Sequence, residues 1–209
     1  MKSKNGAYTA LIISGTLFGW FALIAQLYLI IHNRTGSVPE TIIRYFSYFT
    51  ILTNILAALF YTVSWLGRST KFYKYIWWPP LLTAITVYMC VVGLVYQVLL
   101  RPLWSPTGLQ LIVDEILHSV QPVLTVIFWW MFADTSHLSL KGSIRWLSYP
   151  LAYLIFILIR GSLSGFYPYP FIDVITIGYP TMLVNSVALM AGFLFLSGFF
   201  IWIGKRRGR

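Results

Sequence analysis

Long apolar stretches alternate with short polar connections along the whole chain. Six stretches are long enough, at ~20 residues, to cross the hydrocarbon core of a membrane as helices. They span residues 8–31, 41–66, 75–100, 110–132, 145–166 and 178–203. Their apolar residues are continuous rather than alternating, which argues against a β-barrel. The pattern predicts an all-α polytopic membrane protein, a six-transmembrane-helix bundle that forms one domain over residues 1–209.

The composition supports this class. Hydrophobic residues make up 58% of the chain and charged residues only 10%, against about 25% charged in soluble domains. An ordinary soluble enzyme is therefore excluded, and we expect an integral multi-pass protein, in the cell membrane if the source is a bacterium. The single cysteine, Cys90, excludes an intrachain disulfide and a cysteine-based zinc site. No metal or organic cofactor is expected.

The positive charge indicates topology rather than nucleic acid as a partner. The net charge is +10, and the basic residues lie in short caps between the apolar stretches, where they would face anionic lipid. With six crossings the termini share one side, which holds eleven Lys and Arg residues against four on the other. The positive-inside rule then places both termini in the cytoplasm.

Polar residues gather at one depth of the expected bundle. At a rise of 1.5 Å per residue, Thr50 lies ~14 Å into the second stretch, His118 ~12 Å into the fourth and Asn185 ~10 Å into the sixth. Arg160 lies near the outer end of the fifth stretch. We therefore predict a polar cavity that opens toward the outer leaflet.

The fourth stretch carries a polar face. Asp114, His118, Gln121 and Thr125 are spaced four, three and four residues apart, so they share one side of a helix. Ionisable groups within a membrane usually face the bundle interior or a wet cavity. The simpler interpretations are a favourable acid at a helix start for Asp114 and an inter-helix hydrogen bond for His118. Pro122 removes the helical partner of the carbonyl at position 118, which predicts a local kink.

The second stretch offers hydroxyl groups. Thr50, Thr53 and Asn54 lie within it, and such residues usually serve as packing contacts between membrane helices. A threonine becomes a nucleophile only when a base removes its proton. His118 is the one histidine expected within the membrane, which makes it the candidate base. Spacing alone does not decide between Thr50 and Thr53.

Three short segments, in this order and spacing, carry a family resemblance. They are Tyr48-Phe49-Thr50-Ile51-Leu52, the run from Asp114 to Pro122 with His118 inside it, and Tyr169-Pro170-Phe171. With them the chain resembles the androgen-induced-gene family of multi-pass membrane proteins. The characterised members of that family are threonine hydrolases of fatty acid esters of hydroxy fatty acids. The resemblance implies Thr50 as the nucleophile and His118 as the second catalytic residue.

The resulting hypothesis is a hydrolase of membrane lipid esters. Asp114 can orient the imidazole, Gln121 belongs to the supporting polar face, and Asn54, Asn185 or a backbone amide can stabilise the oxyanion. Arg160 either extends to the interface or anchors an anionic part of the substrate. Two alternatives use the same residues: a small lipid or solute transporter or lipid-binding protein without catalysis, and a structural protein whose polar groups join helices.

Overall fold

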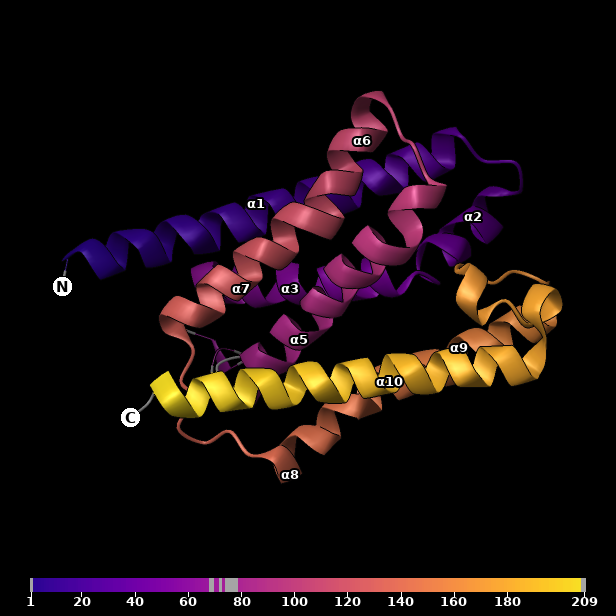
Figure 1. Cartoon of the computed structure of the whole chain (residues 1–209). Helices are drawn as coiled ribbons and strands as arrows, with labels where there is room; N and C mark the ends of the chain where they lie inside the picture. Colours follow the sequence, from indigo (N-terminus) through magenta and orange to yellow (C-terminus); the bar gives the residue numbers. More distant parts are fainter. Residues whose placement is uncertain (1, 68–69, 72, 74–78, 208–209) are drawn as a thin grey trace.

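The computed structural model describes residues 2–67, 70, 71, 73 and 79–207 (Figure 1). Every regular element in these ranges is helical, and six segments are long and apolar enough to cross a membrane. The predicted six-helix, all-α membrane fold is therefore confirmed. The first residues predicted for the third span, 75–78, lie outside the described ranges. The six segments are Gly6–His32, Phe49–Leu66, Pro80–Leu103, Gly108–Phe132, Leu140–Ser164 and Val174–Arg207.

The helices follow one another as a bundle with short connections. The start of α1 and the end of α10 lie at the same end of the bundle (Figure 1), as six crossings require. Which side of the membrane this end faces stays a prediction. The α-helices are α1 (Lys2–His32), α2 (Val38–Tyr45), α3 (Phe49–Leu66), α5 (Pro79–Val95), α6 (Gly108–Glu115), α7 (Gln121–Phe132), α8 (Leu140–Ser143), α9 (Ser148–Ser164) and α10 (Val174–Arg207). Short 3₁₀ turns occur at Arg101–Leu103, Ile144–Leu147 and Pro170–Ile172.

Close packing of α1 against α3 depends on two glycines one turn apart. A Cβ atom added at Gly15 would lie 2.5 Å from a ring carbon of Tyr61, and one added at Gly19 would lie 3.0 Å from the Cβ of Ala58. Small residues at this four-residue spacing let membrane helices approach closely. At these two positions α1 and α3 leave no room for a larger side chain.

The second predicted stretch is not one helix. The chain leaves helical geometry between Tyr45, the last residue of α2, and Phe49, the first residue of α3. The Ser47 hydroxyl donates to the carbonyl of Ile43 at 2.7 Å, and the Tyr153 hydroxyl donates to the carbonyl of Ser47 at 2.9 Å. These bonds satisfy backbone groups that a continuous helix would have paired. The prediction of a single span over residues 41–66 is wrong for this reason.

The break moves Thr50. It lies in the first turn of α3, after the N-cap residue Tyr48, and not three turns down a helix. Its amide is therefore one of the N–H groups that have no acceptor within their own helix. The sequence contains a signal for the separate helix α2: Ser37 and Glu40 have capping-box spacing, and the Ser37 hydroxyl accepts from the Glu40 amide.

Two spans contain a π-helical turn, at Tyr96–Leu100 and at Ile116–Val120. The second turn ends next to Pro122, where the missing amide predicts a disturbed helix. The structure has a wider turn that contains His118, and a kink of the helix at this place stays a prediction. π turns inside α-helices often occur at functional sites.

Candidate active site

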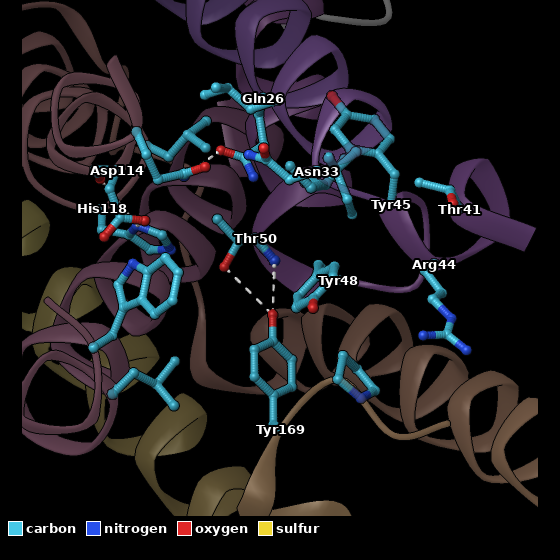
Figure 2. Close-up of a pocket in the computed structure, with 18 of the residues that line it drawn as sticks. Gln26, Asn33, Thr41, Arg44, Tyr45, Tyr48, Thr50, Asp114, His118 and Tyr169 are labelled. Atoms are coloured by element: carbon cyan, nitrogen blue, oxygen red, sulfur yellow. Dashed lines mark hydrogen bonds and ion pairs between the residues drawn. The ribbon is translucent and has the colours of Figure 1, made fainter. Parts of the chain in front are cut away.

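A cavity of about 540 Å³ lies in the half of the bundle away from the termini. Its walls come from the ends of α1 and α2, the first turn of α3, the turn at Tyr96, α6 and the loop after α9. Figure 2 shows Thr50, Asp114, His118 and Tyr169 around this space. The prediction that Thr50, Asp114 and His118 meet at one cavity therefore agrees with the structure.

The imidazole of His118 is held from two sides. Its Nδ1 lies 2.9 Å from the Asp114 carbonyl oxygen and 3.3 Å from Oδ1 of the same residue. Because both partners are acceptors, Nδ1 carries the proton. The ring also stacks on Tyr96, with centroids 4.0 Å apart and planes 13° from parallel, and the Tyr96 hydroxyl donates to Asp114 Oδ2. This arrangement leaves Nε2 as the nitrogen that can accept a proton.

The neighbouring acid, Glu115, belongs to a different network. It pairs with Arg101 and accepts from the Ser119 hydroxyl at 2.7 Å. Its carboxylate is about one third exposed, whereas that of Asp114 is nearly buried. Of the two consecutive acids, only Asp114 faces the imidazole, as the helical spacing predicts.

Thr50 lines the cavity, and both its backbone amide and its hydroxyl lie near the hydroxyl of Tyr169. Its amide donates to the Tyr169 hydroxyl at 3.2 Å, and its Oγ1 lies 3.4 Å from the same hydroxyl. Tyr169 is fixed by parallel stacking on Phe171 and edge contact with Tyr48. Burial raises the pKa of Tyr169 to about 12, so its hydroxyl keeps its proton at neutral pH.

The two threonines left open by the sequence differ in access. Thr53 is fully buried, its hydroxyl bonds to that of Tyr149 at 3.1 Å, and it lines neither described cavity. Thr50 is slightly exposed, at 8%, and lines the cavity. Access therefore favours Thr50. No hydrogen bond joins Thr50 directly to His118 in the described part of the chain, so their approach within hydrogen-bond reach stays a prediction.

Asn54 lies behind Thr50 rather than beside the cavity. Its amide nitrogen donates to the Thr50 carbonyl at 2.9 Å and to the Leu117 carbonyl at 3.2 Å. The side chain is completely buried and does not line the cavity. It therefore bridges the first turn of α3 to the π turn that carries His118.

The other two amides predicted for the site also bind backbone. The Gln121 amide nitrogen donates to the Gly15 carbonyl at 2.8 Å, and that of Asn185 donates to the Phe171 carbonyl at 3.0 Å. Neither lines the cavity. The predicted polar face of the fourth span thus divides at the π turn. Asp114 before the turn and His118 within it line the cavity, whereas Gln121 after it bonds to α1.

Arg160 shares one acidic partner on α2 with Arg44. Its Nη2 lies 2.9 Å from Oε1 of Glu40, and Nε of Arg44 lies 2.8 Å from the same oxygen. Both guanidinium groups lie over the ring of Phe166, at 4.6 Å for Arg44 and 4.8 Å for Arg160. Hydrogen bonds from Arg44 and then Arg160 hold the pKa of Glu40 below its usual value. Arg44 lines the cavity and Arg160 does not.

Sequence reasoning did not assign Tyr169, Tyr96 or Arg44 to the site. Tyr169 belongs to the Tyr169-Pro170-Phe171 segment of the family resemblance, but no role was drawn from it, and Tyr96 carries no local signal because it reaches the site from another span. Arg44 follows the capping signal of α2 and could have been placed by it.

Comparisons with family models, with curated proteins and with solved structures find no match to this chain. The family resemblance therefore stays a prediction, and the case for a function rests on the geometry of the cavity. What the structure establishes is an integral multi-pass membrane protein with a cavity lined by a threonine and by a histidine that a carboxylate holds.

Proposed function

We propose that this protein is an intramembrane hydrolase of lipid esters, with Thr50 as nucleophile and His118 as general base. One observation supports this most strongly: the Thr50 hydroxyl and an imidazole held by Asp114 line the same cavity. A hydroxyl, an imidazole and a carboxylate in these roles form the arrangement that activates nucleophiles in many unrelated hydrolases.

The first half of the reaction acylates Thr50. Its Oγ1 attacks the ester carbonyl carbon, and its proton passes to Nε2 of His118. The carbonyl π pair moves onto oxygen and gives a tetrahedral oxyanion. When that intermediate collapses, the bond to the leaving alcohol breaks, and the alcohol takes the proton from His118. Asp114 stabilises the imidazolium that forms between these steps.

The second half releases the acid. Water replaces the alcohol, loses a proton to His118 and attacks the acyl carbon. Collapse of the second tetrahedral intermediate returns the proton to Oγ1 of Thr50 and frees a carboxylic acid. The products are one acid and one alcohol, and the protein is regenerated.

A change of side-chain rotamer connects the resting geometry to this mechanism. Oγ1 of Thr50 now contacts the Tyr169 hydroxyl. Threonine in a helix populates two χ1 rotamers, so a rotation about one bond releases Oγ1 from Tyr169 and turns it toward the imidazole. The weak 3.4 Å contact with Tyr169 presents little barrier to that rotation.

A second cavity explains why the substrate would be a lipid. It measures about 80 Å³, and Thr50, Leu100 and Tyr169 line it as well as the larger cavity. Its other walls come almost entirely from apolar side chains of α5, α9 and α10. At this size it holds only the first few carbons of an acyl chain, and a chain that enters it would put its ester carbonyl beside Thr50. This position suits a fatty acyl ester, including the esters of hydroxy fatty acids that the resemblance implies.

A fluorophosphonate probe tests the proposal. The probe should label the purified protein at Thr50, as located by mass spectrometry, and label neither Thr50→Val nor His118→Gln. The matched control is Thr53→Val, which loses a neighbouring buried hydroxyl and should be labelled like the original protein. If the protein is not labelled, and single cysteines introduced into the cavity wall react with thiol reagents from both membrane faces, the protein is instead a transporter.

A further inference from the structure

We infer that the Tyr169 hydroxyl, together with the Thr50 amide, binds the oxyanion of the tetrahedral intermediate. Tyr169 is then a catalytic residue of the site, which the sequence did not reveal. The inference rests on the proposed function and adds the group that stabilises the developing charge. Removal of one such donor typically lowers kcat by about 10²–10³-fold.

The first donor follows from the break before α3. Thr50 follows the N-cap Tyr48 by two positions, so its N–H has no acceptor within the helix. Its partner in the structure is the Tyr169 hydroxyl oxygen. Hydrolases of the serine type commonly use the amide of the nucleophile itself for the oxyanion. The partial positive charge of the helix N-terminus favours the same anion.

The second donor is the hydroxyl hydrogen of Tyr169. The oxygen of this group already accepts from the Thr50 amide. The Phe49 backbone amide also donates toward this oxygen. The acceptor near the hydroxyl hydrogen, among the described residues, is Oγ1 of Thr50 at 3.4 Å, a long and weak contact. The hydrogen is therefore available to a better acceptor. With its side chain 7% exposed and its pKa raised to about 12 by burial, Tyr169 stays protonated throughout the neutral range.

The chemistry of the intermediate brings the oxyanion to these donors. In the tetrahedral adduct the oxyanion and Oγ1 of Thr50 are bonded to the same carbon. A donor adjacent to Oγ1 is therefore adjacent to the oxyanion as well. The Tyr169 hydroxyl lies 3.2 Å from the Thr50 amide, and the rotation that turns Oγ1 toward the imidazole moves neither group, so both donors stay beside the Thr50 backbone. The donors of Asn54 and Asn185 instead bind backbone carbonyls outside the cavity.

Tyr169→Phe isolates the hydroxyl, because the ring keeps its stacking on Phe171 and its contact with Tyr48. The matched control is Tyr88→Phe, which removes another buried tyrosine hydroxyl, one that donates to the Trp146 carbonyl and lines neither cavity. With 4-nitrophenyl octanoate in detergent micelles, Tyr169→Phe should lower kcat about 10²–10³-fold with little change in KM. Tyr88→Phe should keep kcat.

A transition-state analogue separates catalysis from structure. An octyl trifluoromethyl ketone adds to the nucleophile and forms a stable oxyanion, so Tyr169→Phe should weaken its binding by the same factor as kcat/KM. If Tyr169 had a merely structural role, the binding of the ketone would not weaken in proportion to kcat/KM. If the variant does not fold, the adduct of the original protein decides: its oxyanion must lie within hydrogen-bond distance of the Tyr169 hydroxyl and the Thr50 amide. An oxyanion directed away from Tyr169 overturns the inference.

Failure of the two proposals can be told apart with Thr50→Val. If that variant hydrolyses the octanoate ester as well as the original protein, the hydrolase proposal itself fails. If Thr50→Val is inactive while folded Tyr169→Phe keeps full kcat, the hydrolase stands and the assignment of Tyr169 is wrong.

Discussion

Asn54 offers the sharpest separation of stability from activity in this protein. Replacement by leucine keeps the side-chain size and removes both hydrogen bonds, to the Thr50 and Leu117 carbonyls. Side-chain hydrogen bonds between membrane helices average about 0.6 kcal/mol and reach about 1.7. Only the bond to Leu117 joins two helices, since Thr50 lies on α3 with Asn54, so this bond is worth roughly 0.6–1.7 kcal/mol and the bond within α3 adds little. The Asn54 Oδ1 atom is buried without a partner, so its removal offsets part of the loss, and Asn54→Leu should cost about 1 kcal/mol.

The effect on turnover should be larger. Asn54 ties the helix end that carries Thr50 to the π turn that carries His118. Loss of this bridge loosens the placement of nucleophile and base. Displacements of about 1 Å can cost about 100-fold in rate. We expect kcat for 4-nitrophenyl octanoate to fall at least about tenfold, which corresponds to about 1.4 kcal/mol in the activation free energy.

Gln121→Leu is the matched control. Gln121 is also fully buried, donates to a backbone carbonyl on another helix and has a buried oxygen without a partner. Its side chain points toward α1 and does not line the cavity. Thermal unfolding in detergent should show similar losses for both variants, with kcat reduced only in Asn54→Leu. Equal kcat in both, at equal stability, would refute the positioning argument.

Three further predictions concern the arginine cluster and the topology. Arg44→Gln should raise KM roughly tenfold for an ester that bears a free carboxylate and leave KM for its methyl ester unchanged, since Arg44 lines the cavity. Arg160→Gln should lower Tm without this difference between the two esters. If Arg160→Gln instead raises KM for the acid ester alone and Arg44→Gln does not, Arg160 has the anchor role that the sequence suggests. The lowered pKa of Glu40 stabilises the fold fully above its usual value of 4.5 and less as pH falls below it; Tm of Glu40→Gln should therefore depend less on pH in that acid range, and parallel curves for the two proteins would contradict this. Alkaline phosphatase fused to the C-terminus should be inactive, because the termini are expected in the cytoplasm; an active fusion reverses the topology.

The spans were predictable because their apolar runs reflect the thickness of the bilayer alone. The pairing of Asp114 with His118 was also predictable, because a four-residue spacing on a helix fixes the geometry locally. The length of a span and the pairing of Asp114 with His118 are each set by residues of a single helix. The disturbed backbone near Pro122 belongs to the same class, since a missing amide acts only on its own turn.

The position of Thr50 at a helix end was not predictable from hydropathy. No proline or glycine marks the break near Ser47, and the carbonyl freed there is satisfied by Tyr153, about a hundred residues away in the chain. The ion pair of Arg160 with Glu40 likewise joins elements 120 residues apart. Such long-range partners leave no spacing pattern in the sequence.

The number of residues in the π turn at Ile116–Val120 helps to specify the site, because it sets the rotation of α6 relative to α7. Deletion of one residue within it would allow a regular helix and rotate α6 relative to α7 by about 100°. Asp114 and His118 would then turn away from the cavity, while Gln121 could keep its contact with Gly15. A single-residue gap at this turn in a related sequence would therefore mark a protein that keeps the bundle but has lost the chemistry, even if every polar residue were still present.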